Sequence, residues 1–505
     1  MWHGPSMSEN QQSGKHEGAE PPAADAPRML KMIGYTLAAI VLLRLLSLPF
    51  YPILDKTEAR YAEIGMHMLQ TGNWITPLIE PNVPYWGKPP LSMWLTALSY
   101  LAFGLNEFGA RFSSFVIYGL LLYLTYRVGA NERDRLFGLT AALVLSSMGL
   151  AFYLGGAVMT DPALTLGITL TMVGFWLGTR RADRAGSYLF FLGLPIALLA
   201  KGPIGVILPG LAIGAWIAWQ RQWAATWRNL PWITGTCLVL VLALPWYYLA
   251  ELKTPGFLRY FIIGEHFERY LVSNWRGDLY GSGRSLPLGT IWLLGFAATL
   301  PWPFVWVTAL LNGEQRSLVF NRHLLRDPWL GYLIAWALAP FVFFTLARNT
   351  LLTYVAPAMP ALALLTAHVL RNLQFDRFRL RIPLLAALTP LVFTAIIAAI
   401  QIAPRSVPMP SQVNIVRAYE GLRVGPRYNL IYLFDRPYSA DFYTRGRAKL
   451  AKTTDGVIAA IEQADDPYFA ISINRFGMLP AALRERLETI TSANGTLLLR
   501  PRPKA

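Results

Sequence analysis

The chain has 505 residues, of which 54% are hydrophobic and 15% are charged, and its mean hydropathy is +0.37. This composition is too apolar for a soluble protein of this size and indicates a membrane protein. The net charge of +16 would suggest nucleic-acid binding in a soluble chain, but the basic residues stand mostly in short gaps between apolar runs, so no nucleic-acid partner is expected.

The N-terminal residues 1–27 are rich in Ser, Gly, Pro, Glu and Ala and contain no apolar run. We predict that they form a disordered cytoplasmic tail and not a signal peptide. The first apolar segment begins at Met29 and is about 20 residues long, which is enough to cross the hydrocarbon core as a helix.

About eleven apolar segments are predicted to cross the membrane within a transmembrane domain at 28–404. They lie near 29–50, 110–128, 136–154, 161–179, 187–200, 203–220, 231–250, 287–309, 328–346, 350–370 and 382–403. Alternate gaps are rich in arginine, and the positive-inside rule places these gaps in the cytoplasm. We therefore expect a multi-pass inner-membrane protein, surrounded by membrane lipids, with periplasmic loops at 52–109 and 251–286 and a periplasmic C-terminus.

Two regions differ from this pattern. The segment Leu91 to Gly104 is apolar but short and rich in Trp and Tyr, which favours a helix that lies at the membrane interface or re-enters it. Residues 411–505 are predicted to form a small α/β domain, with strands at Asn429–Phe434 and Tyr468–Asn474 and a helix at Leu479–Ile490. The predicted fold class is thus a mainly α polytopic membrane protein with a small C-terminal α/β periplasmic domain.

The long loop after the first segment carries specific strings. They are DKTEARYAEIGMHMLQTGNWITP at 55–77, VPYWGKPPLSMW at 83–94 and GLNEFGARFSS at 104–114. These strings resemble the lipid A aminoarabinose transferases and protein O-mannosyltransferases, which are membrane enzymes of the C-type glycosyltransferase fold. Looser matches follow in MTDPALT at 159–165, KGPIGVILP at 201–209, PGFLRYFIIGEHFERYL at 255–271 and TYVAPAMPALALL at 353–365.

The resemblance covers most of residues 30–370. It implies transfer of a sugar from a polyprenyl phosphate donor, such as undecaprenyl phosphate, to a periplasmic acceptor. Lipid A, another envelope glycan and a protein all stay open as acceptors, because specificity depends on the shape of the pocket.

Three carboxylates are candidate catalytic residues. Asp55 and Glu58 follow the outer end of the first segment, and a positioned carboxylate can take the proton from an attacking hydroxyl. The resemblance assigns this base to the stretch, where we favour Asp55 and keep Glu58 as the alternative; both could instead be ordinary helix-start carboxylates. Asp161 either caps a helix or, as the resemblance implies, orients the acceptor or holds a water or a cation.

Outward-facing cations could stabilise a departing lipid phosphate, because they neutralise its developing charge. Lys88, Lys201 and Arg348 are such residues, and Arg60 and Arg111 are also predicted outside. The alternative is that these side chains snorkel to lipid headgroups. Lys88 stands in GKPP where many relatives have EKP, so a glycine replaces the glutamate of the relatives.

Further candidates lie in the second long loop and in a late segment, and one more, Tyr85, lies in the first long loop. Glu265 and Arg269 have the spacing of a helical ion pair, while Glu265 and His266 match the family's EHF string and, with Tyr85, are assigned to the donor cavity. Tyr354 either hydrogen-bonds the carrier phosphate or belongs to an aromatic belt. With one cysteine and no clustered His and Cys, no residue is assigned as a metal ligand and no cofactor is required, although a divalent cation stays open.

Rival functions predict other features. A lipid or glycan transporter or flippase usually has ionisable residues at mid-span, whereas here they cluster in outer loops. An O-antigen polymerase or ligase would lack the DKTEARYAE and GKPP strings. A non-catalytic assembly protein would leave these strings unexplained.

Overall fold

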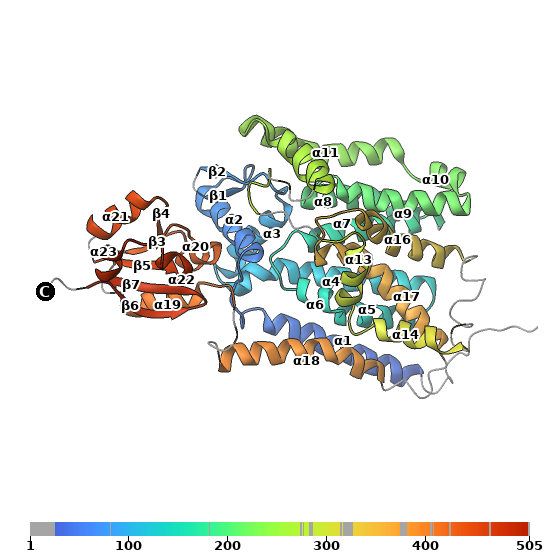
Figure 1. Cartoon of the computed structure of the whole chain (residues 1–505). Coiled ribbons are helices and arrows are strands. Elements are labelled where there is room, and N and C mark those ends of the chain that lie inside the picture. Colours follow the sequence, from blue (N-terminus) through green and yellow to red (C-terminus); the bar gives the residue numbers. More distant parts are fainter. Residues whose placement is uncertain are drawn as a thin grey trace, which may run out of the picture.

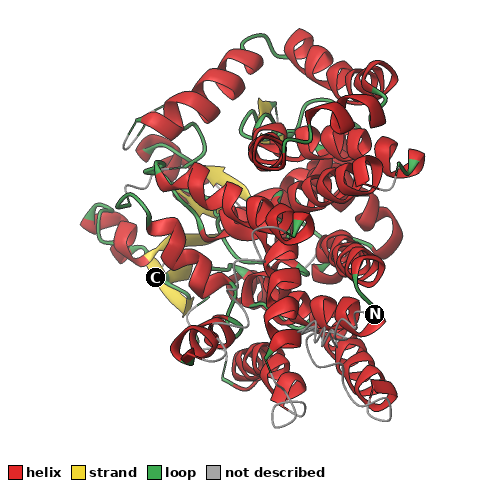
Figure 2. Cartoon of the chain, turned by 90° about the vertical axis from the view of Figure 1, so that its right-hand side faces the viewer, coloured by secondary structure: helices red, strands yellow, loops and turns green. Residues whose placement is uncertain are grey.

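A computed structural model describes residues 26–80, 82–180, 182–272, 275, 277–281, 286–313, 316, 327–373, 381–403, 407, 409–423, 426–463 and 466–502. Long helices run side by side in a bundle, and a small domain with a five-stranded sheet stands at one end of it (Figure 1). Helices make up most of the described chain, and its strands gather in two places (Figure 2). The predicted tail lies outside the described residues except for its last two, which begin the first helix.

The bundle consists of apolar helices. They are α1 Ala26–Ser47, α4 Glu107–Glu132, α5 Arg135–Ser147, α6 Gly149–Leu154, α7 Asp161–Arg180, α8 Arg184–Lys201, α9 Ile204–Gln220, α10 Trp223–Asn229, α11 Trp232–Lys253, α13 Thr290–Ala298, α14 Pro303–Leu311, α16 Pro328–Thr345, η2 Leu352–Ala358, α17 Met359–Asn372 and α18 Arg381–Ile402. Within the described ranges, 8 helices are long and apolar enough to cross a membrane, or 9 if a bent pair counts as one span. Each predicted segment is helical over most of its length, and the count of eleven stays a prediction.

Two predicted segments are not straight helices. The segment at 287–309 bends by 105° between α13 and α14, where Pro301 removes a backbone donor. The segment at 136–154 breaks at Met148, whose backbone is extended. With 13 residues, α5 is about 20 Å long and too short to span the hydrocarbon core alone.

Ion pairs hold three of the inter-helix gaps together. Arg133 lies 2.6 Å from Asp327, and Arg371 lies 2.5 Å from Asp134. The gaps after α4, before α16 and after α17 therefore meet at one end of the bundle, as the alternation of arginine-rich gaps predicted.

The long loops form ordered structure at the other end. The first contains α2 Thr57–Thr71, the strands β1 Leu78–Glu80 and β2 Val83–Pro84, and α3 Leu91–Phe103, which coincides with the predicted interfacial helix. The second continues from α11 into the π-helix η1 Arg259–Glu268 and the short α12 Arg269–Leu271. Local π-helical turns are frequent at functional sites, and η1 contains the candidate residues Glu265 and His266.

The C-terminal domain has a mixed sheet in the order β4-β3-β5-β7-β6. Strands β3, β4 and β5 are parallel, and β7 pairs antiparallel with β5 and β6. Its elements are α19 Val413–Leu422, β3 Leu430–Leu433, α20 Tyr438–Thr444, β4 Lys449–Ala451, α21 Thr454–Gln463, β5 Tyr468–Ser472, α22 Ile473–Phe476, α23 Ala481–Glu485, β6 Leu487–Ala493 and β7 Thr496–Pro501. The prediction of an α/β domain with strands near 430 and 470 is confirmed.

The predicted helix at Leu479–Ile490 is wrong over its second half. Only Ala481–Glu485 is helical, and Leu487–Ala493 forms strand β6. Asn494 and Gly495 both have positive φ, 50° and 75°, and connect β6 to β7 in a tight hairpin. The β-branched run Thr489 to Thr491 favours the strand over a continued helix.

Candidate active site

Glu58 forms a buried ion pair with Arg111. Its side chain is 4% exposed, and Arg111 donates to both carboxylate oxygens, with Nε 2.9 Å from Oε1 and Nη2 3.0 Å from Oε2. The other Arg111 N–H groups donate to three backbone carbonyls, those of Leu48, Tyr51 and Pro52. All five donors of the guanidinium are therefore used, and Arg111 has none left for a phosphate.

Asp55 is the more accessible of the two loop-one carboxylates. It is half-buried, and both of its oxygens accept hydrogen bonds from Ser439 on α20: the Ser439 N–H donates to Oδ1 at 2.9 Å and the hydroxyl donates to Oδ2. Burial raises the pKa of Asp55, and the hydrogen bonds from Ser439 oppose this shift. Sequence reasoning missed Ser439, since no spacing pattern links positions so far apart.

Lys88 belongs to a charge network in the two long loops. Its Nζ lies 2.7 Å from Glu265 Oε2, and Arg269 Nη1 lies 3.1 Å from the same carboxylate and 3.5 Å from Asp278. Burial alone would raise the pKa of Glu265, but Lys88 and Arg269 lower it to about 2. The helical pair Glu265–Arg269 is confirmed, and the structure extends it to Lys88 and Asp278.

Arg269 has an unused donor. Its Nε is buried and has no hydrogen-bond partner among the described residues. A buried polar group without a partner is costly, which suggests that an additional acceptor binds there. Sequence reasoning assigned Arg269 only to the helical pair.

Asp161 and Lys201 join the start of α7 to the end of α8. Lys201 Nζ donates to Asp161 Oδ1 at 2.7 Å and lies 4.9 Å from the centroid of the Tyr354 ring. The Asp161 side chain is therefore an ion-pair partner rather than only a helix cap. His266 reaches this group from η1, with Nε2 3.2 Å from the Lys201 carbonyl oxygen. Burial lowers the pKa of His266.

Tyr85 connects these groups across loop one. Its hydroxyl oxygen lies 3.4 Å from that of Tyr61, and it is close enough to Lys88 to influence the pKa of the ammonium group. A Cβ at Gly87 would lie 2.7 Å from the Tyr85 hydroxyl oxygen. The Tyr85 ring therefore fills the space that a side chain at position 87 would need, which favours glycine at this position.

Arg60 and Arg348 have different surroundings. The Arg60 guanidinium lies 5.2 Å from the centroid of the Tyr438 ring, and its buried Nε has no hydrogen-bond partner in the described ranges. Arg348 is exposed in the turn between α16 and η2, and its backbone oxygen accepts from the N–H of Leu286. We use the term cation cluster for Lys88, Arg269, Lys201 and Arg60.

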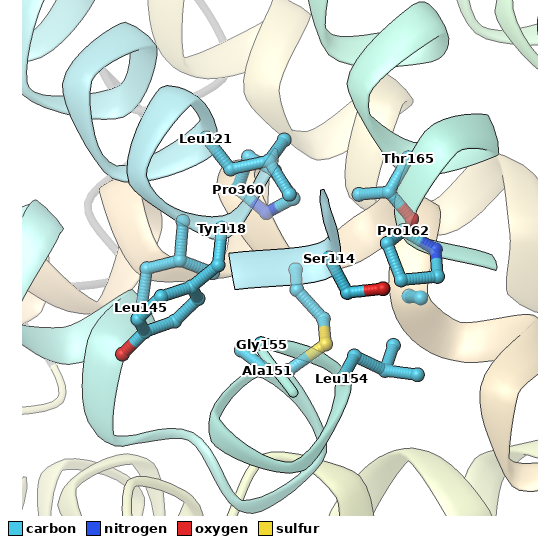
Figure 3. A pocket seen from close by; sticks show the side chains of 12 residues that line it. Ser114, Tyr118, Leu121, Leu145, Ala151, Leu154, Gly155, Pro162, Thr165 and Pro360 are labelled. Carbon is cyan, nitrogen blue, oxygen red and sulfur yellow. The ribbon is translucent and has the colours of Figure 1, made fainter. Parts of the chain in front are cut away.

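A small cavity lies inside the bundle beside this site. It has a volume of about 20 Å³, which is enough for roughly one water molecule. Figure 3 shows the side chains around it, among them Ser114 and Tyr118 from α4 and Pro162 from α7. Its walls are mostly apolar and it is too small for a sugar, so the cation cluster is the better candidate for a donor site.

Comparisons with known proteins show which families this chain resembles. Residues 52–261 match the sequence model of the dolichyl-phosphate-mannose-protein mannosyltransferase family. The undecaprenyl phosphate-alpha-4-amino-4-deoxy-L-arabinose arabinosyl transferase of Enterobacter sp. (strain 638) is 30% identical over 67% of this chain and 58% of its own length. Its counterpart in Pseudomonas paraeruginosa is 32% identical over 64% of this chain and 57% of its own length.

The chain thus spans somewhat more than half the length of these relatives. Among solved structures, ArnT from Cupriavidus metallidurans bound to undecaprenyl phosphate matches with a TM-score of 0.74 and 20% identity. The match covers 95% of this chain and 98% of that one. The fold of the chain is therefore the C-type fold that the loop-one strings predicted.

Proposed function

Because the chain is a relative of the undecaprenyl phosphate-aminoarabinose arabinosyl transferases and has the fold of ArnT, we propose that it is a lipid-phosphate-sugar-dependent glycosyltransferase. It transfers a sugar from undecaprenyl phosphate to lipid A, another envelope glycan or a protein. The observation that carries the proposal is the partly buried cation cluster, of which Arg60 contacts the ring of Tyr438, the residue next to the serine that binds Asp55.

The cation cluster binds the phosphate of the carrier. Lys88 and Lys201 are paired with carboxylates at 2.7 Å in this structure, since a buried cation needs an anionic partner. A phosphate oxygen competes for the same ammonium groups and accepts from the unused Nε donors of Arg269 and Arg60. Arg348 is exposed, and we place it at the edge of this site.

Asp55 acts as the general base. The acceptor hydroxyl attacks the anomeric carbon of the donor sugar, its proton passes to Asp55, and the bond from that carbon to the phosphate oxygen breaks. The carrier leaves as a phosphate monoester whose charge the cation cluster stabilises. The ring of Tyr438 contacts Arg60, and the next residue, Ser439, binds Asp55, so the proposed base and one cation of the cluster lie at the same part of α20.

The role of Asp161 follows from its partner. Lys201 forms an ion pair with Asp161 and lies against the ring of Tyr354. The Asp161 carboxylate therefore fixes the position of the Lys201 ammonium group, where α7 begins and α8 ends. We propose that Tyr354 closes this side of the phosphate site and that His266 and Tyr85 line the donor cavity.

The active site and the C-terminal domain lie on the periplasmic side in this proposal. Arginine-rich gaps meet at one end of the bundle, which the positive-inside rule assigns to the cytoplasm. Reporter fusions after Ala505 test this orientation. A reporter that is active only in the cytoplasm would contradict it.

Transfer is tested with purified protein and undecaprenyl-phosphate-linked sugars. The expected result is release of undecaprenyl phosphate that requires both the protein and an acceptor. Mass spectrometry of lipid A, envelope glycans and exported proteins, with and without the gene, then identifies the acceptor. If all three classes are unchanged and no carrier is released with any sugar donor, the proposal is wrong.

A transporter is less consistent with the structure. In the described spans the charged residues lie near the helix ends: Asp161 begins α7, Lys201 ends α8, and Arg44 lies in the last turn of α1. A transporter would place ionisable groups near the middle of the membrane.

A further inference from the structure

A second cluster of ionisable side chains joins loop one to the C-terminal domain. Glu63 and His67 lie one helical turn apart on α2, and Asp441 reaches them from α20. All three are buried, with 2%, 6% and 1% of their surface exposed. One ligand-type atom from each residue lies within 4.8 Å of the other two. The proposed transfer reaction uses none of them.

The hydrogen bonds around His67 leave one ring nitrogen facing an anion. Nδ1 lies 3.2 Å from the carbonyl oxygen of Leu78, which can only accept, so this nitrogen carries the hydrogen. Nε2 faces Asp441 Oδ2, also at 3.2 Å, so either a proton on Nε2 or a bound cation links these two atoms. Two electron-rich atoms at this distance repel each other unless a cation or a proton lies between them. A backbone carbonyl that accepts from the other ring nitrogen is also typical of metal-bound histidine.

The two carboxylates have unused acceptor sites. Glu63 Oε2 is buried and has no hydrogen-bond partner within the described part of the chain. Arg436 Nη1 donates to the carbonyl oxygen of Ala448 and also lies 2.9 Å from Asp441 Oδ1. Asp441 is therefore ion-paired, although this oxygen accepts no hydrogen bond within the described part of the chain. In the metal-free site Glu63 and Asp441 share a hydrogen bond, and the buried Glu63 oxygen that has no partner can bind a cation.

We propose that Glu63, His67 and Asp441 bind a divalent transition-metal ion, through one oxygen of each carboxylate and Nε2 of the histidine. Tetrahedral coordination with bonds of about 2.0 Å places neighbouring ligand atoms roughly 3.3 Å apart. The 3.2 Å between His67 Nε2 and Asp441 Oδ2 agrees with this value. Rotation of the Glu63 side chain completes the set, and a water takes the fourth position.

The charges around the cluster favour a dication. In the metal-free site burial raises the pKa of Glu63. When the ion binds, this carboxyl gives up its proton, and Glu63 and Asp441 then supply two negative charges. Arg436 is the cation that contacts Asp441 directly. A divalent ion balances the remaining charge, and it holds α20 against α2. Because Asp441 follows Ser439 by two residues, the ion also fixes the serine that positions Asp55.

Metal binding is tested on full-length protein in detergent, with any affinity tag removed. The protein is stripped with EDTA and dialysed against Zn²⁺, and bound zinc is measured by mass spectrometry. We expect one zinc per chain and a higher unfolding temperature with zinc. Glu63→Gln, His67→Gln and Asp441→Asn should each weaken binding by more than about 100-fold, since even outer-shell changes cost 10–100-fold.

Two matched controls should keep the zinc. Glu80→Gln breaks an exposed pair with Lys452 across the same interface, and His266→Gln removes the histidine beside Lys201. If the wild type binds no zinc at micromolar concentration, or if His266→Gln loses it while His67→Gln keeps it, the proposal is overturned.

A fourth variant covers the case in which the substitutions prevent folding. His67→Cys, made together with Cys237→Ser, retains a metal ligand at position 67. With Co²⁺ this protein should show a thiolate-to-cobalt charge-transfer band that the wild type lacks. A folded His67→Cys protein that binds no cobalt, or binds it without this band, would also refute the site.

Discussion

Replacing Asp55 by Asn should separate the proposed catalytic carboxylate, Asp55, from the structural carboxylate, Glu58. Ser439 donates to both oxygens of Asp55. In Asp55→Asn the carbonyl oxygen still accepts from the Ser439 N–H, and the serine hydroxyl can rotate to accept from the new amide. The side chain therefore stays in place, but it can no longer accept a proton.

The two effects have different sizes. Loss of a general base costs about 10²-fold or more in turnover, which corresponds to at least about 2.7 kcal/mol in the barrier. Loss of the carboxylate charge should cost only about 1 kcal/mol in the free energy of unfolding. Glu58→Gln is the opposite case, since it leaves the buried Arg111 without its anion and should cost about 3–5 kcal/mol of stability.

Both variants are measured for turnover with the undecaprenyl-linked donor and for thermal unfolding in detergent. We expect Asp55→Asn to unfold almost like the wild type and to transfer sugar at least about 100-fold more slowly. If Asp55→Asn keeps its turnover, while Glu58→Gln is inactive with an unchanged unfolding temperature, the two roles must be exchanged. A phosphate acceptor, which is already ionised, would make the Asp55→Asn defect smaller.

Four further outcomes follow from the same contacts. Lys88→Ala should reduce donor use and product retention by about 10-fold or more, and Lys88→Arg need not restore them because the two cations differ in shape. The control is Lys452→Ala at an exposed position, and equal defects in Lys88→Ala and Lys452→Ala would count against a phosphate site. Arg111→Lys cannot replace five N–H donors and should lower the free energy of unfolding by about 3 kcal/mol, whereas an unchanged unfolding temperature would contradict the structural role. Ser439→Ala removes a hydrogen bond that lowers the pKa of Asp55, so the acidic limb of the pH–rate profile should move to higher pH, and an unmoved limb would argue against Asp55 as the base. Glu265 has a pKa of about 2 against 4.5 for the free group, so its contribution to stability is present above pH 4.5 and is lost as the pH falls towards 2. The unfolding temperature of Glu265→Gln should lack this part of the acid dependence, and the same pH dependence in wild type and variant would refute the assignment.

The bundle was largely predictable because its signals are local. A run of about 20 apolar residues indicates a spanning helix whatever its neighbours are, and all such segments are helical here. Breaks inside a run were not predictable from hydropathy. The break at Met148 and the bend after α13 depend on tertiary packing and on the backbone conformation of single residues. Residues Leu487–Ala493 form a strand although their pattern of apolar and polar residues also fits a helix.

Candidate site residues were predictable where a known string contains them, and their partners were not. Lys88, Asp161 and Lys201 stand in such strings, but the pairs Lys88–Glu265 and Lys201–Asp161 arise from the fold. Arg111 shows the limit most clearly. A buried arginine that binds five acceptors has the same sequence signature as an outward-facing cation.

The attachment of Asp55 to the C-terminal domain has a consequence for biogenesis. Asp55 and Ser439 are 384 residues apart, so the carboxylate obtains its partner only after nearly the whole chain has been synthesised and the C-terminal domain has docked on loop one. A nascent chain with every helix inserted would still have an unpositioned carboxylate. If Asp55 is the general base, as proposed, the protein would thus stay inactive during its own assembly in the membrane.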